Sequence, residues 1–336
     1  MNLRRTIPIL AVSCFCASAC RREPMPAPAV KTSPSFERKL QLGPFIRGNL
    51  HTHTNRSDGD SSPARVASWY RDHGYQFLAL TDHNLVTDLS LTREVESKDF
   101  VVISGEEVSM WHAGKQVHVN ALCTTQTIGG GDFKSASDAL LRGIREVQMQ
   151  GGIALINHPN FDQAISPADI PAFQGASFIE IFSGHGYVQS QGDSTRPSHE
   201  ALWDMALSQG IDLMGAAIDD MHHLEICADP PANPGKGWVY VSVAALTPEK
   251  ICAELKNARI VSSTGPAIRR VLVSNEHYEV EPEDDSVQVV FLGRGGKVLS
   301  SGSRRYILKG GEGYVRARLD SKDGEHAWTP AVRVVL

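Results

Sequence analysis

The sequence has no excess of positive charge, few cysteines and, after its first twenty residues, no long hydrophobic run. Its formal net charge of −5 gives no overall excess of positive charge, so a sequence-independent grip on long nucleic acids is not expected. No later apolar run is long enough to cross a membrane. Past residue 20 the cysteines are Cys123, Cys227 and Cys252, an odd set without paired spacing. They are interpreted as small buried apolar residues, not as a disulfide framework or a zinc site.

The first twenty residues are typical of an export signal. Two arginines precede an apolar stretch that starts at Ile7, and Ala17-Ser18-Ala19 has the small side chains of a cleavage site. Cys20 follows at once, so the segment resembles a bacterial lipoprotein signal, although Ala17 stands where leucine is usual. We expect a periplasmic or cell-envelope lipoprotein anchored at Cys20 or, after ordinary cleavage, a secreted protein. Residues 1–20 are then the leader, and the Pro- and Ala-rich residues 21–40 an extended tether.

Between about residues 45 and 243, short apolar strands alternate with segments of helical period. The strands are near-continuous apolar runs, as expected of strands buried on both faces. They are expected at Ile46–His53, Tyr75–Thr81, Phe100–Ser104, Gln116–Leu122, Gly152–Asn157, Phe178–Phe182 and Leu213–Ile218. Helices are expected after Ser62, through Ala139–Val147, around Leu202–Ala206 and after Thr247. Repeated strand–helix units predict an α/β protein with a parallel sheet, and seven strands predict a closed or nearly closed barrel over residues 41–262.

Residues 263–336 change to alternating and β-branched patterns separated by glycine turns. Strands are expected at Val271–Ser274, Ser286–Leu292, Tyr306–Lys309, Tyr314–Leu319 and Val332–Leu336, with an acidic turn at Glu281–Asp285. This pattern predicts a small antiparallel β module. Because no cluster of metal-binding residue types falls inside it, its expected role is structural.

Side chains of the kinds that bind metals stand at or near the ends of most barrel strands. His51 and His53 are two residues apart on a strand, so both imidazoles leave the same face. Barrels of this kind gather their chemistry at the C-terminal strand ends. The side chains expected to meet there in a shared metal site are His51, His53, Asp58, His83, Glu107, His118, His158, Asp220 and His222.

These motifs, in their order along residues 47–243, resemble those of the PHP (polymerase and histidinol phosphatase) family. They are His51-x-His53 with Ser57-Asp58-Gly59, Thr81-Asp82-His83, Gly105-x-Glu107, His118, His158-Pro159 and Asp220-x-His222. Residues 69–84, 219–220, 322–324 and 327–330 are similar to metallohydrolases resembling carbaryl hydrolase. The resemblance implies a distorted (β/α)7 barrel with a C-terminal β module, and two or three divalent ions such as Zn, Mn or Fe.

The resemblance also implies how the ligands are shared among the ions. One ion would take His51, His53, Glu107 and Asp220, with Glu107 bridging to a second ion on His118 and His158. A third ion would take Asp58, His83 and His222.

Clustered divalent ions generate hydroxide from water at neutral pH and hold phosphoryl oxygens, so attack by metal-bound hydroxide is expected. For the acid that protonates the leaving group, the sequence offers Asp82, Asp219, His112, His185 and His223. Asp82 is alternatively a carboxylate that orients an imidazole. Three cations in expected loops are interpreted as exposed charges in preference to groups that bind an anionic substrate, namely Lys115, Arg196 and Lys236. Four histidines are interpreted as surface residues, namely His73, His199, His277 and His326.

The sequence therefore predicts a metal-dependent hydrolase of small phosphoesters. One alternative is a hydrolase of carbamates or carboxylic esters. Another is a non-catalytic metal-binding surface protein, against which the complete ligand set argues. The expected partners are a small-molecule ester and, only through the N-terminal lipid, a membrane.

Overall fold

The computed structural model describes residues 34–225 and 232–335, and the contacts of Ser33–Leu336 form one compact unit. The export signal, Cys20, most of the tether and Cys227 lie outside the described residues. Within the described ranges, none of the helices combines the length and apolarity that a bilayer crossing requires.

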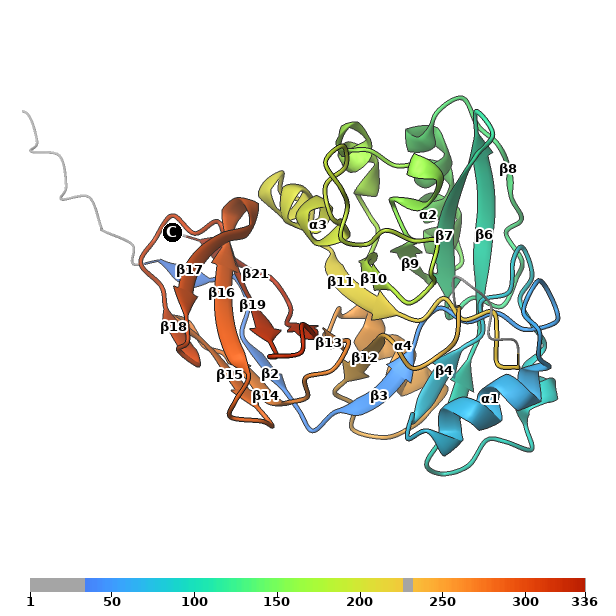
Figure 1. Ribbon diagram of the computed structural model, residues 1–336, viewed down its shortest axis with the longest axis horizontal. Coiled ribbons are helices and arrows are strands. Elements are labelled where there is room, and N and C mark those ends of the chain that lie inside the picture. The colour runs from blue at the N-terminus through green and yellow to red at the C-terminus, as the bar shows by residue number, and fades with distance from the viewer. Residues whose placement is uncertain (1–33, 226–231, 336) are drawn as a thin grey trace, which may run out of the picture. The chain divides into compact units, whose positions relative to one another are not determined.

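The first two-thirds of the described chain is a mixed α/β structure (Figure 1). All seven expected strands are present, mostly a few residues shorter than predicted. They are β3 (Ile46–Asn49), β4 (Phe77–Ala79), β5 (Val101–Ile103), β7 (Lys115–Leu122), β9 (Ile153–Ile156), β10 (Phe178–Ser183) and β11 (Met214–Ile218). Four strands in this part were not expected, namely β6 (Gly105–His112), β8 (Gly131–Asp132), β12 (Trp238–Val241) and β13 (Ile260–Ser263).

These strands belong to two sheets that meet where the candidate ligands lie. One sheet contains the order β13-β12-β3-β4-β5, and the other has the order β11-β10-β9-β7-β6-β8. Two isolated parallel bridges link the sheets. Thr52 and Met221 pair just beyond β3 and β11, and His83, beyond β4, pairs with Glu107 within β6.

The expectation of parallel pairing holds for β3-β4-β5 and for β9-β10-β11 but is wrong for β7. The run Gly105-Glu106-Glu107 begins β6, which forms an antiparallel hairpin with β7. The two-residue turn between them, Ala113-Gly114, has positive φ at both positions, as a tight hairpin with right-handed strand twist requires. A glycine followed by two acids had indicated the end of a strand, not its beginning.

Four α-helices pack against these strands. They are α1 (Pro63–Asp72), α2 (Ala136–Met149), α3 (His199–Ser208) and α4 (Pro248–Lys256). Each starts at a serine or threonine whose side chain accepts a backbone N–H of the first turn, at Ser62, Ser135, Ser198 and Thr247. Short 3-10 helices complete the description at η1 (Leu89–Thr92), η2 (Phe161–Gln163), η3 (Pro167–Phe173) and η4 (Arg294–Gly296).

Strand β9 shows why the sheets are buried on both faces. Ile153 and Leu155 belong to the apolar cluster that β3, β4 and β5 also line, and α4 joins it through Ile251. The alternate residues Ala154 and Ile156 belong to a second cluster with α2 and α3. Because side chains alternate along a strand, a continuous apolar run serves both clusters. The sheet is thereby held rigid beneath the ligand-bearing ends.

The C-terminal strands are antiparallel, as expected, and more numerous than expected. They are β14 (Ile268–Val273), β15 (His277–Pro282), β16 (Gln288–Gly293), β17 (Lys297–Ser301), β18 (Arg305–Ile307), β19 (Tyr314–Asp320), β20 (His326–Trp328) and β21 (Val332–Val335). The expected acidic turn starts too early, because Glu281 and Pro282 still belong to β15 and Glu281 pairs with Arg269. Strand β20 pairs with β13, which makes these strands continuous with the sheet that carries β3.

Residues 34–40 differ from the expected tether. Strand β1 (Ser35–Phe36) pairs with β21, and β2 (Leu40–Leu42) pairs with β14. Phe36 and Leu42 are buried in the C-terminal cluster, so apolar side chains draw this segment into the fold.

The interpretation of all three cysteines as unpaired is wrong. Cys123, directly after β7, and Cys252, on α4, form a disulfide bond across 129 residues. Spacing along the sequence gave no sign of this pair, because the fold alone brings the two segments together.

Candidate metal centre

The paired histidines after β3 are fixed by backbone hydrogen bonds to the segment after β11. His53 N donates to the Met221 carbonyl at 2.9 Å, and Asp220 N donates to the His51 carbonyl at 3.1 Å. The side chain of Asn49 accepts the His51 N–H at 3.0 Å and donates to the Gly237 carbonyl at 2.8 Å. These bonds hold both imidazoles against the Asp220 carboxylate.

The first candidate group consists of four buried side chains, His51, His53, Glu107 and Asp220. The Nε2 atoms of the two histidines are 3.1 Å apart, and each lies 3.1 Å from Glu107 Oε2 and 3.3 Å from Asp220 Oδ1. Ligand atoms placed tetrahedrally at about 2.0 Å from a common ion are about 3.3 Å apart. Asp220 Oδ1 is buried and accepts no hydrogen bond from the described residues, so its lone pairs are available. This donor set fits a divalent cation.

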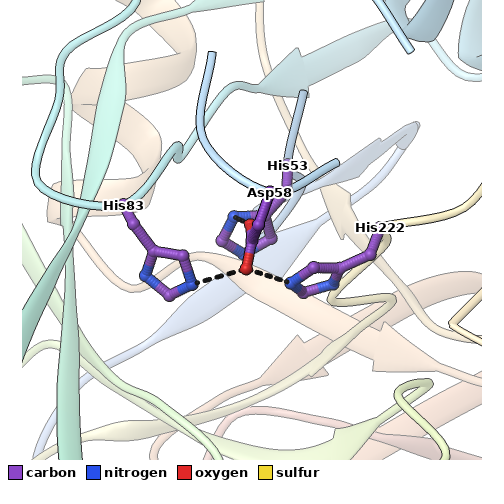
Figure 2. Close-up of side chains that lie close together, drawn as sticks. All are labelled: His53, Asp58, His83 and His222. Atoms are coloured by element: carbon purple, nitrogen blue, oxygen red, sulfur yellow. Dashed lines mark ion pairs between the residues drawn. The ribbon is translucent and has the colours of Figure 1, made fainter. Parts of the chain in front are cut away.

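The second group surrounds the half-exposed carboxylate of Asp58 (Figure 2). His83 Nε2 lies 3.4 Å and His222 Nε2 3.5 Å from Asp58 Oδ2. His53 Nδ1 lies 3.4 Å from Asp58 Oδ1. The two nitrogens of His53 thus face different groups, Nε2 the first and Nδ1 the second.

The third group consists of His83, Glu107 and His118. His118 Nδ1 lies 2.8 Å and His158 Nε2 3.1 Å from Glu107 Oε1, the oxygen that the first group leaves free. Neither ring nitrogen of the buried His118 makes a hydrogen bond with a described residue. Eight of the nine expected ligands therefore lie in three adjoining groups, and the ninth, His158, contacts Glu107 beside the third group. Glu107 contacts members of each group.

Charge in these groups is balanced by protons when no metal is bound. Burial alone would lower the pKa of His53, but the neighbouring carboxylates of Asp220 and Glu107 outweigh it and raise the pKa to about 10. Burial would raise the pKa of Glu107, yet His51, His118 and His83 hold it well below its usual value. The pKa of Asp58 is likewise lowered, against its burial, by His222 and His83. Cations bound here would replace protons on the imidazoles, so metal affinity depends on pH.

A carboxylate that the sequence analysis missed supports the first group. Glu180, on β10 and fully buried, lies 2.7 Å from His51 Nδ1 through Oε1, and its Oε2 accepts the His158 N–H at 2.7 Å. A carboxylate on the far nitrogen of an imidazole fixes its tautomer and leaves Nε2 free for a metal. The available signal was a single acid inside the apolar run Phe178–Phe182.

Other polar side chains hold the remaining ligands in place. Asn157 Nδ2 donates to Glu107 Oε1 at 2.7 Å, and Ser109 Oγ lies 2.6 Å from His83 Nδ1. These contacts restrict the rotation of a carboxylate and an imidazole that both face the third group.

Two of the expected catalytic acids serve the loops instead. Asp82 accepts hydrogen bonds from Thr54 N at 2.8 Å and Ser57 Oγ at 2.8 Å, which orders the turn before Asp58. It contacts no imidazole, contrary to the alternative role expected for it. Asp219 accepts the Tyr70 hydroxyl and the backbone N–H groups of residues 235–237. Both carboxylates lie outside the lining of the cavity described next.

His223, the third expected catalytic residue, also lies outside that lining. Its backbone N–H donates to Ala232 at 3.1 Å, and its ring centre is 6.4 Å from that of His222. His199, expected on the surface, is fully buried, and its Nε2 accepts the Asn160 N–H at 3.1 Å.

A cavity of about 250 Å³ opens over the three groups. Besides seven of the candidate ligands, its wall contains His185 and three side chains that the sequence analysis did not place there, namely Gln116, Phe161 and Tyr187. His185 is the one member of the five acid candidates that lines it. Among the described residues, no lysine or arginine lines the cavity. Lys115, the exposed first residue of β7, donates to the Gln163 carbonyl, and the partly buried Arg196 pairs with Asp193.

No protein-family model and no curated protein matches the chain. Among solved structures, it is similar to a two-domain protein from Bacteroides vulgatus containing a predicted PHP-like metal-dependent phosphoesterase. The TM-score is 0.48 at 16% identity, with 89% of this chain and 97% of the other covered.

A candidate metal-dependent phosphoesterase from Bifidobacterium adolescentis is similar with a TM-score of 0.38 at 15% identity, over 52% of this chain and 87% of the other. An amidohydrolase from Chromobacterium violaceum, solved with sulfate and no metal, has a TM-score of 0.42 at 17% identity, over 63% and 96%. These likenesses are distant, so the side chains of this protein carry the conclusions about its chemistry.

Proposed function

We propose that the protein is a metal-dependent hydrolase that binds two or three divalent cations and cleaves small phosphoesters. The observation that carries this proposal is the position of Glu107. Its Oε2 lies 3.1 Å from the imidazoles of the first group, while its Oε1 lies 2.8 Å from His118 in the third. A carboxylate shared in this way suits a multinuclear site, in which divalent cations lower the pKa of water and neutralise charge on phosphoryl oxygens.

The protein's own residues prepare the site for that chemistry. Glu180 holds His51 in one orientation, and Asn157 holds Glu107, so little movement is required when a cation enters. The half-exposed Asp58 and the open cavity leave one side of the centre accessible to substrate. Purely structural metal sites are usually closed, which argues against a non-catalytic metal-binding protein.

The size and lining of the cavity support a small substrate. About 250 Å³ accommodates a small ester, and the net charge of −5 offers no general attraction for a polynucleotide. Since no lysine or arginine lines the cavity, the phosphoryl group would be held by the cations.

The same lining favours a second candidate, a hydrolase of carbamates or carboxylic esters. Phe161 and Tyr187 give the cavity an aromatic wall, and no arginine is present to select phosphate. An aryl carbamate would pack against such a wall and present a single carbonyl oxygen.

Specificity constants for a phosphomonoester, a phosphodiester and an aryl carbamate on one metal-loaded preparation test the proposal. We expect the higher constants for the phosphoesters and their loss after chelation. A carbamate turned over about a hundredfold better, equivalent to about 2.7 kcal/mol of transition-state stabilisation, would establish the second candidate instead. Full activity in strong chelator with no bound metal would overturn both.

We also propose that the protein is exported and anchored through Cys20. The disulfide between Cys123 and Cys252 supports export, because such bonds persist mainly in oxidising compartments. The substitution Cys20→Ala should move the protein from the membrane fraction to the soluble exported fraction without loss of hydrolysis. Wild-type protein found wholly in that soluble fraction would favour ordinary cleavage after Ala19, and retention in the cytoplasm would overturn export.

A further inference from the structure

One segment of the C-terminal strands departs from the acidic character of the chain. Residues 286–311 contain five arginines and lysines and no aspartate or glutamate, in a protein with a net charge of −5. They form β16, the turn η4, β17 and β18 (Figure 1). Residues of η4, β17 and β18 line one groove. Positive charge is therefore concentrated on one part of the surface.

Three of these cations stand at the groove, which has a volume of about 290 Å³. Arg294, Lys297 and Lys309 line it and are exposed, and no ion pair involves them among the described residues. Lys309 lies over the Tyr306 ring, with its Nζ 5.9 Å from the ring centre. The other two cations differ, since Arg304 pairs with Asp285 and Arg305 contacts His277.

The acid in the groove is turned toward the protein. Glu312 Oε1 accepts the Tyr306 hydroxyl at 3.0 Å and the backbone N–H groups of Lys309 at 2.6 Å and Gly310 at 3.1 Å. Its charge orders the glycine turn beside the groove. The rim keeps its positive character.

One strongly exposed aliphatic side chain lines the groove with the cations, and a second follows the groove residue Tyr306. Val298 on β17 lines the groove and is 57% exposed, and Ile307 on β18 is 60% exposed. Cations next to protruding aliphatic side chains match an anionic lipid surface. The lipid phosphates would bind the cations, and the acyl chains would contact the aliphatic side chains. A nucleic-acid duplex would use the charge and leave the aliphatic residues in water.

The N-terminal end of the described chain lies at the same place. A Cβ on Gly310 would contact the Pro34 side chain at 3.8 Å, so residue 34 borders the groove. Cys20 precedes Pro34 by fourteen residues, a distance that an extended chain spans with at most about 50 Å. A lipid at Cys20 would therefore keep the groove within reach of the bilayer to which it is attached.

We propose that Arg294, Lys297, Val298, Ile307 and Lys309, here called the basic face, dock on a membrane surface that carries anionic headgroups. One lipid chain alone binds membranes only marginally, and a cationic surface is an effective second signal. Docking would hold the chain's C-terminal strands on the bilayer, and it is independent of the hydrolytic activity.

Vesicle partitioning of the full chain tests the proposal, with Cys20→Ala in every sample to remove a lipid contribution. Vesicles of phosphatidylcholine alone are compared with vesicles in which about a third of the lipid is phosphatidylglycerol. We expect binding to the anionic vesicles only, weakened by added salt. Lys297→Gln with Lys309→Gln should lower the partition coefficient about thirtyfold, since each cation near an anionic surface contributes about 1 kcal/mol.

The matched control is Lys250→Gln with Lys322→Gln, which removes two exposed lysines elsewhere and should leave partitioning unchanged. Val298→Ser with Ile307→Ser should lower binding to anionic vesicles while metal-dependent hydrolysis stays at the wild-type rate. Equal binding to neutral vesicles, or equal losses in the test and control lysine pairs, would overturn the proposal. So would equal affinity for a DNA duplex combined with no effect of the serine pair, which would indicate a general polyanion surface.

Discussion

The protein buries charge in two places, and they differ in where the positive charge comes from. In the candidate metal centre, three carboxylates face imidazoles, which carry positive charge only when protonated. Beside α3, the fully buried Arg316 donates to Asp204 Oδ1 at 2.9 Å and Oδ2 at 2.7 Å, and to Glu200 at 2.7 Å. Arginine is permanently charged. The second cluster has a permanent cation within the chain, although Arg316 Nη1 makes no hydrogen bond with a described residue. The first cluster gains positive charge only from protons or metal ions.

This difference separates stability from function. The Arg316 cluster joins β19 to α3 and also includes the Tyr314 hydroxyl, 2.6 Å from Asp204 Oδ1. Arg316 also lies over the Trp203 ring, with its Cζ 4.6 Å from the ring centre. Nothing in that geometry calls for an exchangeable ion. The metal centre leaves ligand atoms without hydrogen bonds under an open cavity, as a site that exchanges ions and substrate requires.

The largest expected effect is on turnover, from Glu107→Gln. The loss of a shared carboxylate should lower kcat/KM by about a thousandfold or more, because metals supply several kcal/mol of transition-state stabilisation. The neighbouring Glu106→Gln is the matched control, since Glu106 accepts backbone N–H groups of Ile128 and Gly129. Steady-state kinetics and metal content of both variants check this. Equal losses would mean that Glu107 has no special role.

The next effect is on stability, from Arg316→Met. Removing the cation leaves the buried Asp204 without its guanidinium partner, which should lower the free energy of unfolding by about 3–5 kcal/mol. Urea unfolding measures it, and the folded fraction should keep its kcat. Arg318→Met, which removes a partly exposed guanidinium, should cost about 1 kcal/mol or less. If Arg316→Met kept its stability but lost its metals, the Arg316 cluster would serve metal binding and not stability.

Removing the metals from the candidate metal centre should lower the free energy of unfolding by a comparable amount. Ions at about a thousandfold above their dissociation constant stabilise the folded state by about 4 kcal/mol. Chelation should remove this stabilisation from the wild type and from Arg316→Met alike, and have a smaller effect on Glu107→Gln. Differential scanning calorimetry with and without chelator gives the comparison. Identical shifts in all three proteins would place the stabilising ions elsewhere.

A smaller effect is expected from Glu180→Gln. An amide can still accept from His51 Nδ1 but supplies no negative charge, so metal affinity or activity should fall by about 10–100-fold. Isothermal titration with zinc or manganese measures the affinity. Glu200→Gln, in the other cluster, should leave the affinity unchanged while lowering stability. Wild-type affinity in Glu180→Gln would show that His51 needs no carboxylate behind it.

The two clusters were not equally visible in the sequence. His51 and His53 share a strand face by period alone, and most of the other candidate ligands follow expected strand ends, so they could be proposed before the fold was known. Arg316 and Glu180 each occur as a charged residue within a strand, and their partners lie 112 and 129 residues away. The disulfide was missed for the same reason, since only the tertiary structure brings Cys123 to Cys252. Strand β6 was missed because its first residues are a glycine and two acids whose burial depends on neighbouring strands.

The smallest expected effect is on acid stability, at the edge of the Arg316 cluster. Asp320 lies 2.7 Å from Arg318 Nε and 2.7 Å from His326 Nδ1. Partial burial would raise the pKa of Asp320, but hydrogen bonds with His326 and Arg318 outweigh it and lower the pKa to about 2. A carboxyl with a lowered folded-state pKa stabilises the protein above its unfolded-state pKa near 4, and this contribution is lost as the pH falls toward 2.

Asp320→Asn should therefore lower the free energy of unfolding by about 1 kcal/mol or less at pH 6, since a partly exposed pair contributes little. The difference from wild type should shrink as the pH falls from about 4 to about 2. Urea unfolding of metal-free protein at several pH values measures this change without interference from metal release. The exposed Asp323→Asn is the control and should follow the wild type throughout. A difference that stayed constant down to pH 2 would show that Asp320 acts through packing and not through its charge. The contrast between a self-contained charge cluster and a cation-dependent one would then rest on Arg316 alone.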